Sequence, residues 1–255
     1  MSYTKQSPQS YMDISPDDAS VILSSTLNPT KGFHTTSTTR FALRGPRPHS
    51  CTLHLYFTLP AQLFADPYEL AHRRASYTFE RFGGGNLEAP VFAPAANRPS
   101  ALLLDMIIPE GVDKMDQGSG NVFSIEVPLH ARYGVPKSGG ELMDEVVLLP
   151  PTAFWACPQQ RASGSAENRL QVPDALQDIV ELAPTLKGGA SMLVLIPHTE
   201  SVQAQTLRVP VGDAGDVALV ETGTVVVILL AFVYLVRTIV RASRAQRVST
   251  TKKED

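Results

Sequence analysis

The sequence is poor in cysteine and in net charge. Only 2 of its 255 residues are cysteine, which excludes a disulfide-dense scaffold and a zinc site built on cysteines. The net charge of -3 gives no reason to expect nucleic acid as a partner. Hydrophobic residues make up 43%, too many for a disordered chain and too few for a polytopic membrane protein. We therefore expect one sizeable core, or at most two domains.

Familiar catalytic motifs are also missing. The sequence contains no GxxxxGK phosphate loop, no GxGxxG before a helix, no HExxH and no GxSxG elbow. A DxD pair, which many sugar transferases use, does not occur either. We interpret His49 and His54, the histidines nearest to a zinc-binding spacing, as incidental. The sequence thus predicts no metal ion and no cofactor.

Proline, in contrast, is abundant. Its 20 copies are about 8% of the chain against a typical share of about 5%, which disfavours a helical bundle and favours short strands joined by turns. Apolar and polar residues alternate in Cys51–Leu59 and in Phe123–Tyr133, as in half-buried strands. Pro128 lacks an N–H, so the second strand is expected to lie at an edge or to be bulged. Further strands are expected at Tyr77–Phe82, Ala101–Ile108, Glu145–Leu149, Met192–Ile196 and Thr206–Val211, with a short helix at Asp174–Leu182. The pattern predicts a mainly β protein with an antiparallel β-sandwich-like domain.

One segment near the C-terminus predicts a membrane span. The twenty residues from Val217 to Val236 contain a single charge, Glu221, and a helix of that length crosses the roughly 30 Å hydrocarbon layer. The basic residues that flank the span follow it, beginning with Arg237, whereas acidic residues precede it. The positive-inside rule then places the tail in the cytosol and the β-rich body in a lumen.

The last residues resemble an address signal. Lys252 and Lys253 stand at the fourth and third places from the end, as in the dilysine retrieval signal of single-pass endoplasmic reticulum proteins. A lumenal body needs a signal peptide, and Met1–Asn28 shows none. We expect an incomplete or unusual N-terminus. The alternative is a tail-anchored chain whose body faces the cytosol.

Four regions are expected. They are a poorly ordered N-terminal segment (1–39), a lumenal β-rich domain (40–212), a juxtamembrane segment with the single transmembrane helix (213–240), and a basic cytosolic tail (241–255). Cys51 and Cys157 form a disulfide if the body is lumenal, and the alternative is two buried free thiols.

Four stretches carry a resemblance to a known family. They are Leu59–Leu70 (LPAQLFADPYEL), Val127–Pro136 (VPLHARYGVP), Leu149–Cys157 (LPPTAFWAC) and Arg208–Gly212 (RVPVG). In this order, ahead of a C-terminal membrane helix, they resemble the PIG-X family, the accessory subunits of glycosylphosphatidylinositol (GPI) mannosyltransferase I in the endoplasmic reticulum. The resemblance covers roughly residues 50–236.

The resemblance implies a non-catalytic role. Members of the PIG-X family stabilise a multi-span catalytic subunit, PIG-M, which moves mannose from dolichol-phosphate-mannose to the GPI precursor. One helix cannot build the protein-lined groove that a lipid-linked sugar requires at membrane depth, so catalysis would belong to such a PIG-M-like partner. Candidate contacts with that partner are His130, Arg132, Tyr133, Phe154 and Trp155. The aromatic pair alternatively fills the core.

Two other interpretations stay open. A cargo receptor or adaptor of the early secretory pathway would also combine a β-rich lumenal domain, one span and a dilysine tail. Such receptors usually carry a helical stalk, which Pro210, Gly212 and Gly215 exclude here. The third interpretation is a lumenal enzyme tethered by its tail, for which the sequence offers no recognisable nucleophile or acid pair.

Overall fold

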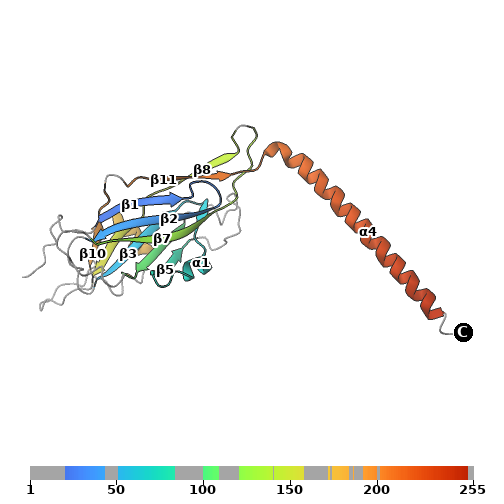
Figure 1. Ribbon diagram of the computed structural model, residues 1–255, viewed down its shortest axis with the longest axis horizontal. Helices are drawn as coiled ribbons and strands as arrows, with labels where there is room; N and C mark the ends of the chain where they lie inside the picture. The colour runs from blue at the N-terminus through green and yellow to red at the C-terminus, as the bar shows by residue number, and fades with distance from the viewer. Residues whose placement is uncertain are drawn as a thin grey trace, which may run out of the picture. The chain divides into compact units, whose positions relative to one another are not determined.

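The structure, a computed structural model, describes most of the chain in two units (Figure 1). The described residues are 21–43, 51–83, 100–108, 121–139, 141–157, 172, 174–183, 186, 192–199 and 202–251. Unit 1 contains those up to Val135 together with Met143–Pro210, and unit 2 contains Pro136–Leu142 together with those from Val211 onward.

Unit 1 is built from three antiparallel sheets. The first has the order β1 (Val21–Asn28), β2 (His34–Leu43), β7 (Asn121–Ala131), β4 (Leu63–Phe64). The second has the order β10 (Met192–Ile196), β9 (Thr152–Cys157), β3 (Thr52–Leu59), β6 (Ser100–Met106), β5 (Tyr77–Phe82). The third pairs β11 (Gln205–Pro210) with β8 (Met143–Leu148).

The main core of unit 1 is formed by the inward faces of these sheets. Phe41 of β2, Leu55 of β3, Val127 of β7 and Leu207 of β11 are fully buried in one continuous cluster. Side chains on alternate strand positions pack together in this way when two sheets face each other. The prediction of a mainly β, antiparallel sandwich-like domain is confirmed.

A second core covers the outer face of the five-stranded sheet. The turn η2 (Asp174–Leu176) and helix α2 (Gln177–Leu182) place Ile179 and Val180 against Tyr56, Leu103 and other residues of that face. Strand β3 is therefore buried on both faces. The prediction of a half-buried strand at Cys51–Leu59 is therefore wrong at His54 and Tyr56, which are both buried. Alternation within one strand does not reveal a helix packed over it.

Strand β7 explains how a proline fits into a sheet. The amide of Ala131 donates to the carbonyl of Phe33 on the β2 side, so Pro128, three residues earlier, has its nitrogen on the opposite side. On that side β4 pairs only with His130 and Ala131. The missing N–H of Pro128 therefore removes no bond to β2, as the predicted edge position requires.

The N-terminal part differs from expectation. The predicted poorly ordered segment 1–39 contains β1 and the first six of the ten residues of β2 in its described portion, and residues 1–20 lie outside the described residues. The inward face of these strands carries small polar side chains, including the buried Ser25, Ser37 and Thr39. A face of this composition produces no hydropathy period, although its strands pair over their full length.

Unit 2 contains helix α4 (Val217–Thr251), a single unbroken helix of 35 residues. Its section Ala214–Ser243, which includes the preceding turn, is long and apolar enough to cross a membrane, and none of its apolar window is buried. The hydroxyls of Thr222, Thr224 and Thr238 donate to backbone carbonyls four residues earlier in the same helix. Their hydrogen bonds are therefore satisfied within the helix and need no water. Lys252 and Lys253 lie outside the described residues.

A short strap holds the start of this helix. The amide of Lys137 donates to Gly212 at 3.0 Å, and the carbonyl of Lys137 accepts from Ala214 at 2.8 Å. Asp213 caps the turn η3 (Ala214–Asp216), because its Oδ1 accepts from Gly215 N at 2.8 Å. Within unit 2, Pro136–Leu142 is thus hydrogen-bonded to the residues that lead into α4.

Candidate functional site

Two of the four family-like stretches meet at one end of unit 1. Strand β4 belongs to the first stretch and pairs with the end of β7 in the second, with Leu63 opposite Ala131 and Phe64 opposite His130. The amide of Arg132 continues the pairing by donating to Gln62 at 2.8 Å. After β3 the chain turns and crosses to the other sheet, where β4 pairs with β7 on the side that faces away from β2.

The tip of the β1–β2 hairpin completes this end. Gly32 donates to the carbonyl of Arg208, and Arg208 donates to that of Thr30, both at 2.9 Å. Gly32 has a φ of +112°, a backbone conformation that residues with a Cβ rarely adopt. Arg208 begins the fourth family-like stretch, so three of the four stretches lie together here.

Aromatic rings and cations cluster on this end. The His130 ring stacks on Phe64 at 5.3 Å between centroids and meets His34 edge-on at 4.6 Å. The Arg132 guanidinium lies 4.8 Å from the centre of the Phe64 ring. The ring of Tyr133 packs against a further aromatic side chain, Phe33, at 4.9 Å. We call this set, together with Tyr68, the aromatic patch; its members are Phe33, His34, Phe64, Tyr68, His130, Arg132 and Tyr133.

Helix α1 (Pro67–Ala71) carries the exposed Tyr68 next to Glu69, whose side chain contacts His130 of the patch. The helix starts where Asp66 Oδ1 accepts from the amide of Tyr68 at 2.9 Å, with Pro67 in the first turn, where a missing N–H costs nothing. Leu70 anchors the helix in the main core. Glu69 Oε2 lies 2.5 Å from His130 Nε2, and this side-chain hydrogen bond ties the helix to β7.

Charges within the patch are compensated locally. Arg132 is buried, and this burial lowers the pKa of its guanidinium, which the face of Phe64 stabilises by a cation–π contact. His130 faces the carboxylate of Glu69. Arg73, just after α1, bonds to Glu126 of β7 at 2.8 Å.

The predicted partner contacts fall into two groups. Tyr133 is 73% exposed on the patch, and His130 and Arg132 lie behind it with little exposure. Phe154 and Trp155 are 0% and 4% exposed in the two different cores, so their prediction as contacts is wrong and the core-filling alternative holds. Consecutive strand residues face opposite sides, and both sides of β9 are covered.

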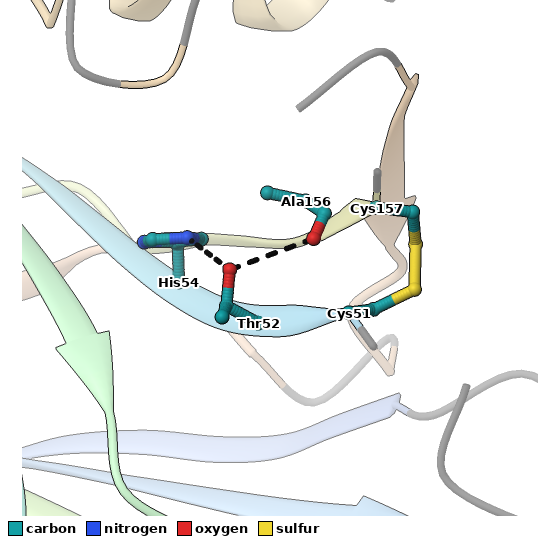
Figure 2. Close-up of a disulfide and its surroundings, with 5 residues drawn as sticks. All are labelled: Cys51, Thr52, His54, Ala156 and Cys157. Atoms are coloured by element: carbon teal, nitrogen blue, oxygen red, sulfur yellow. Dashed lines mark hydrogen bonds between the residues drawn. A yellow bond between two sulfur atoms is a disulfide. The ribbon is translucent and has the colours of Figure 1, made fainter. Parts of the chain in front are cut away.

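Cys51 and Cys157 are joined by a disulfide between the ends of β3 and β9 (Figure 2). Figure 2 also shows the hydroxyl of Thr52, which lies 2.8 Å from His54 Nε2. The His54 ring stacks on Phe154 at 5.3 Å under α2. Burial lowers the pKa of His54, and the negative charge of Asp105 opposes this shift only in part.

Sequence reasoning missed several members of the patch. Tyr68 and Glu69 lie in the first family-like stretch, in the short helix that the cap at Asp66 begins. Phe33 lies outside the family-like stretches, and Phe64, although inside one, was not singled out because its partners come from other segments of the chain. Among the described residues, no group of three or more His, Cys, Asp or Glu side chains is placed to hold a metal ion.

Comparison with known proteins identifies the family. The family model described as PIG-X / PBN1 matches residues 30–240. The chain is 28% identical over 240 residues to Protein PBN1 of Gibberella zeae, covering 89% of this chain and 46% of that protein. It is 34% identical over 147 residues to Protein pbn1 of Emericella nidulans, covering 52% and 26% respectively. For Protein pbn1 of Aspergillus oryzae the identity is 26% over 264 residues, covering 94% and 46%. The chain thus spans about half or less of the length of these relatives. Since the family model covers most of its residues, the chain belongs to the PIG-X / PBN1 family.

Proposed function

We propose that the chain is a non-catalytic subunit that stabilises the multi-span, PIG-M-like catalytic subunit of GPI mannosyltransferase I. That enzyme transfers the first mannose from dolichol-phosphate-mannose to the GPI-anchor precursor in the endoplasmic reticulum. The observation that carries the proposal is the family match, which extends through the sandwich and the membrane-spanning candidate.

The proposed orientation has the sandwich in the lumen and the tail in the cytosol. The arginines that follow the span support it, because basic residues are retained on the cytosolic side. The Cys51–Cys157 disulfide supports it independently, because such bonds persist in the oxidising secretory compartment. We keep the dilysine at Lys252 and Lys253 as the proposed retrieval signal.

Stabilisation follows from binding the folded partner alone. A protein that binds only the native form of another raises its apparent stability by mass action. We propose that α4 packs against a span of the partner, with Gly223, Thr224 and Ala231 as small residues that permit close approach. On the lumenal side, we propose His130, Arg132 and Tyr133 as parts of the contact region.

Deleting the gene tests the function. Surface GPI-anchored proteins should be lost, and the catalytic subunit should fall in abundance while its messenger RNA stays unchanged. Overexpressing that subunit should restore anchoring, because a stabiliser is dispensable when its client is abundant. Normal anchoring after deletion would contradict the proposal, and failed rescue would show a role other than stabilisation.

A further inference from the structure

We propose that the aromatic patch is a docking surface for a membrane-proximal loop of a membrane-embedded protein partner. This inference rests on the proposed function, since it names the surface through which the lumenal unit meets the catalytic subunit. Four observations carry it: the exposure of two tyrosines, the rigid packing behind them, the compensated charges around them, and the short connection to α4.

Tyr68 and Tyr133 are unusually exposed for aromatic side chains. Their exposed fractions are 78% and 73%, and they come from separate segments that β4 and β7 bring together. Tyrosine is enriched at the centres of protein interfaces, because it supplies a large contact area and a hydroxyl while losing little side-chain entropy. Two such rings on one end of the sandwich are therefore typical of an interface.

The patch is held in place from behind. Tyr133 packs on Phe33, whose carbonyl accepts from the amide of Ala131 at 2.7 Å. His130 and Arg132, two residues apart at the same strand end, both contact the Phe64 ring. A surface that is already ordered before binding pays a smaller entropic cost when the partner binds. His130 and Arg132 thus act as supports, and Tyr68 and Tyr133 provide the exposed contacts.

The charges favour a protein over bare lipid. His130 faces Glu69, Arg73 faces Glu126, and Arg132 is buried against a ring. Lys31, at the hairpin tip, is an exposed lysine beside the patch. Recognition of anionic headgroups typically uses clusters of four to eight basic residues. The carboxylate of Glu69 would be repelled by such headgroups.

Short segments of chain connect the patch to the residues that precede α4. Tyr133 is three residues from Pro136, a distance of at most roughly 11 Å between Cα atoms. Pro136 begins the strap, whose next residue bonds to Gly212 and Ala214, just before α4. Arg208, which bonds to the hairpin tip beside the patch, is two residues before Pro210, the last residue of unit 1 before the chain continues into unit 2.

Photocrosslinking from single positions tests this surface. The full chain, co-expressed with its catalytic partner, would carry benzoylphenylalanine at Tyr133, at Tyr68 or at Val122. Val122 is a matched control, because it is 46% exposed and lies at the opposite end of β7, roughly 35 Å from Tyr133. We expect adducts with the mannosyltransferase from both tyrosine positions, at least about tenfold above the yield from Val122.

A second pair of variants separates contact from folding. Tyr133→Ala should reduce the co-purified partner on the order of tenfold, whereas Tyr133→Phe should retain most of it, with both unfolding midpoints unchanged. Adducts with lipid alone, or equal yields from Val122, would overturn the inference.

A photocrosslinker at Val227, within α4, tells the two proposals apart. Adducts from Val227 without any from Tyr133 would reject the surface and leave the function standing. No adduct from any position, with no mannosyltransferase co-purified, would reject the function itself.

Discussion

Cys51 and Cys157, which are 106 residues apart in the sequence, are joined by a disulfide that links β3 to β9. Because the bond closes a long loop, it restricts the unfolded chain more than a short-range disulfide would. It also fixes the end of β3, the central strand of the five-stranded sheet, to β9. The loss of either cysteine therefore affects a pairing that both cores share.

We expect Cys51→Ala to lower the free energy of unfolding by about 2–5 kcal/mol. Thermal or urea unfolding of the purified chain in detergent measures the change. Since each single variant removes the same bond, the Cys51→Ala/Cys157→Ala pair should lose about as much as one single variant. Additive losses would mean that the two side chains stabilise the fold separately rather than as a disulfide.

His54 predicts a pH dependence of stability. Its pKa is lowered in the folded chain, mainly by burial, whereas in the unfolded chain it lies near 6.5. As the pH falls through 6.5, the unfolded chain binds a proton first, so the free energy of unfolding decreases with falling pH until the folded-state pKa is passed. The unfolding midpoint measured from pH 8 to pH 5 should fall less steeply in His54→Gln than in the natural chain. Equal slopes would assign the acid sensitivity to other groups.

Among the structural elements, strands with an apolar inner face could be predicted from sequence. Tyr77–Phe82 and Met192–Ile196 match β5 and β10 at both ends, because their neighbouring turns are also visible in the sequence. Strands β1 and β2 were missed, since serine and threonine form much of their buried face. The two-residue strand β4 is too short to produce a period at all.

The aromatic patch could be predicted only in part. His130, Arg132 and Tyr133 were identified because a family-like stretch contains them. Their neighbours depend on contacts between distant segments, such as that between Glu69 and His130, which are 61 residues apart. A single sequence contains no signal for such a pairing.

Helix α2 is expected to act as the cover of the second core. Ile179→Ala should lower the free energy of unfolding by about 2–4 kcal/mol, because it opens a cavity over Phe154 and its neighbours. Glu181→Ala, on the exposed face of the same helix, is the matched control and should change stability by less than about 0.5 kcal/mol. Similar unfolding midpoints for the two variants would show that the sheet does not depend on this cover.

For the whole molecule, the orientation in the membrane is the decisive property. Protease added to sealed microsomes should remove only the tail and leave the sandwich intact, because the bilayer shields a lumenal unit. Both cysteines should resist maleimide labelling until a reductant is added. Permeabilised microsomes are the control for protease access. Digestion of the sandwich in sealed vesicles would place it in the cytosol and contradict the proposed orientation.

The order of synthesis gives the disulfide a further consequence. Cys51 emerges from the ribosome 106 residues before Cys157, a delay of about 5–20 s at ordinary translation rates. Strand β6 is already present by then and can pair with β3, whereas β9 is not. In the oxidising compartment proposed here, Cys51 therefore remains a free thiol until Cys157 has been synthesised. During that interval it can form a transient mixed disulfide with a folding oxidoreductase.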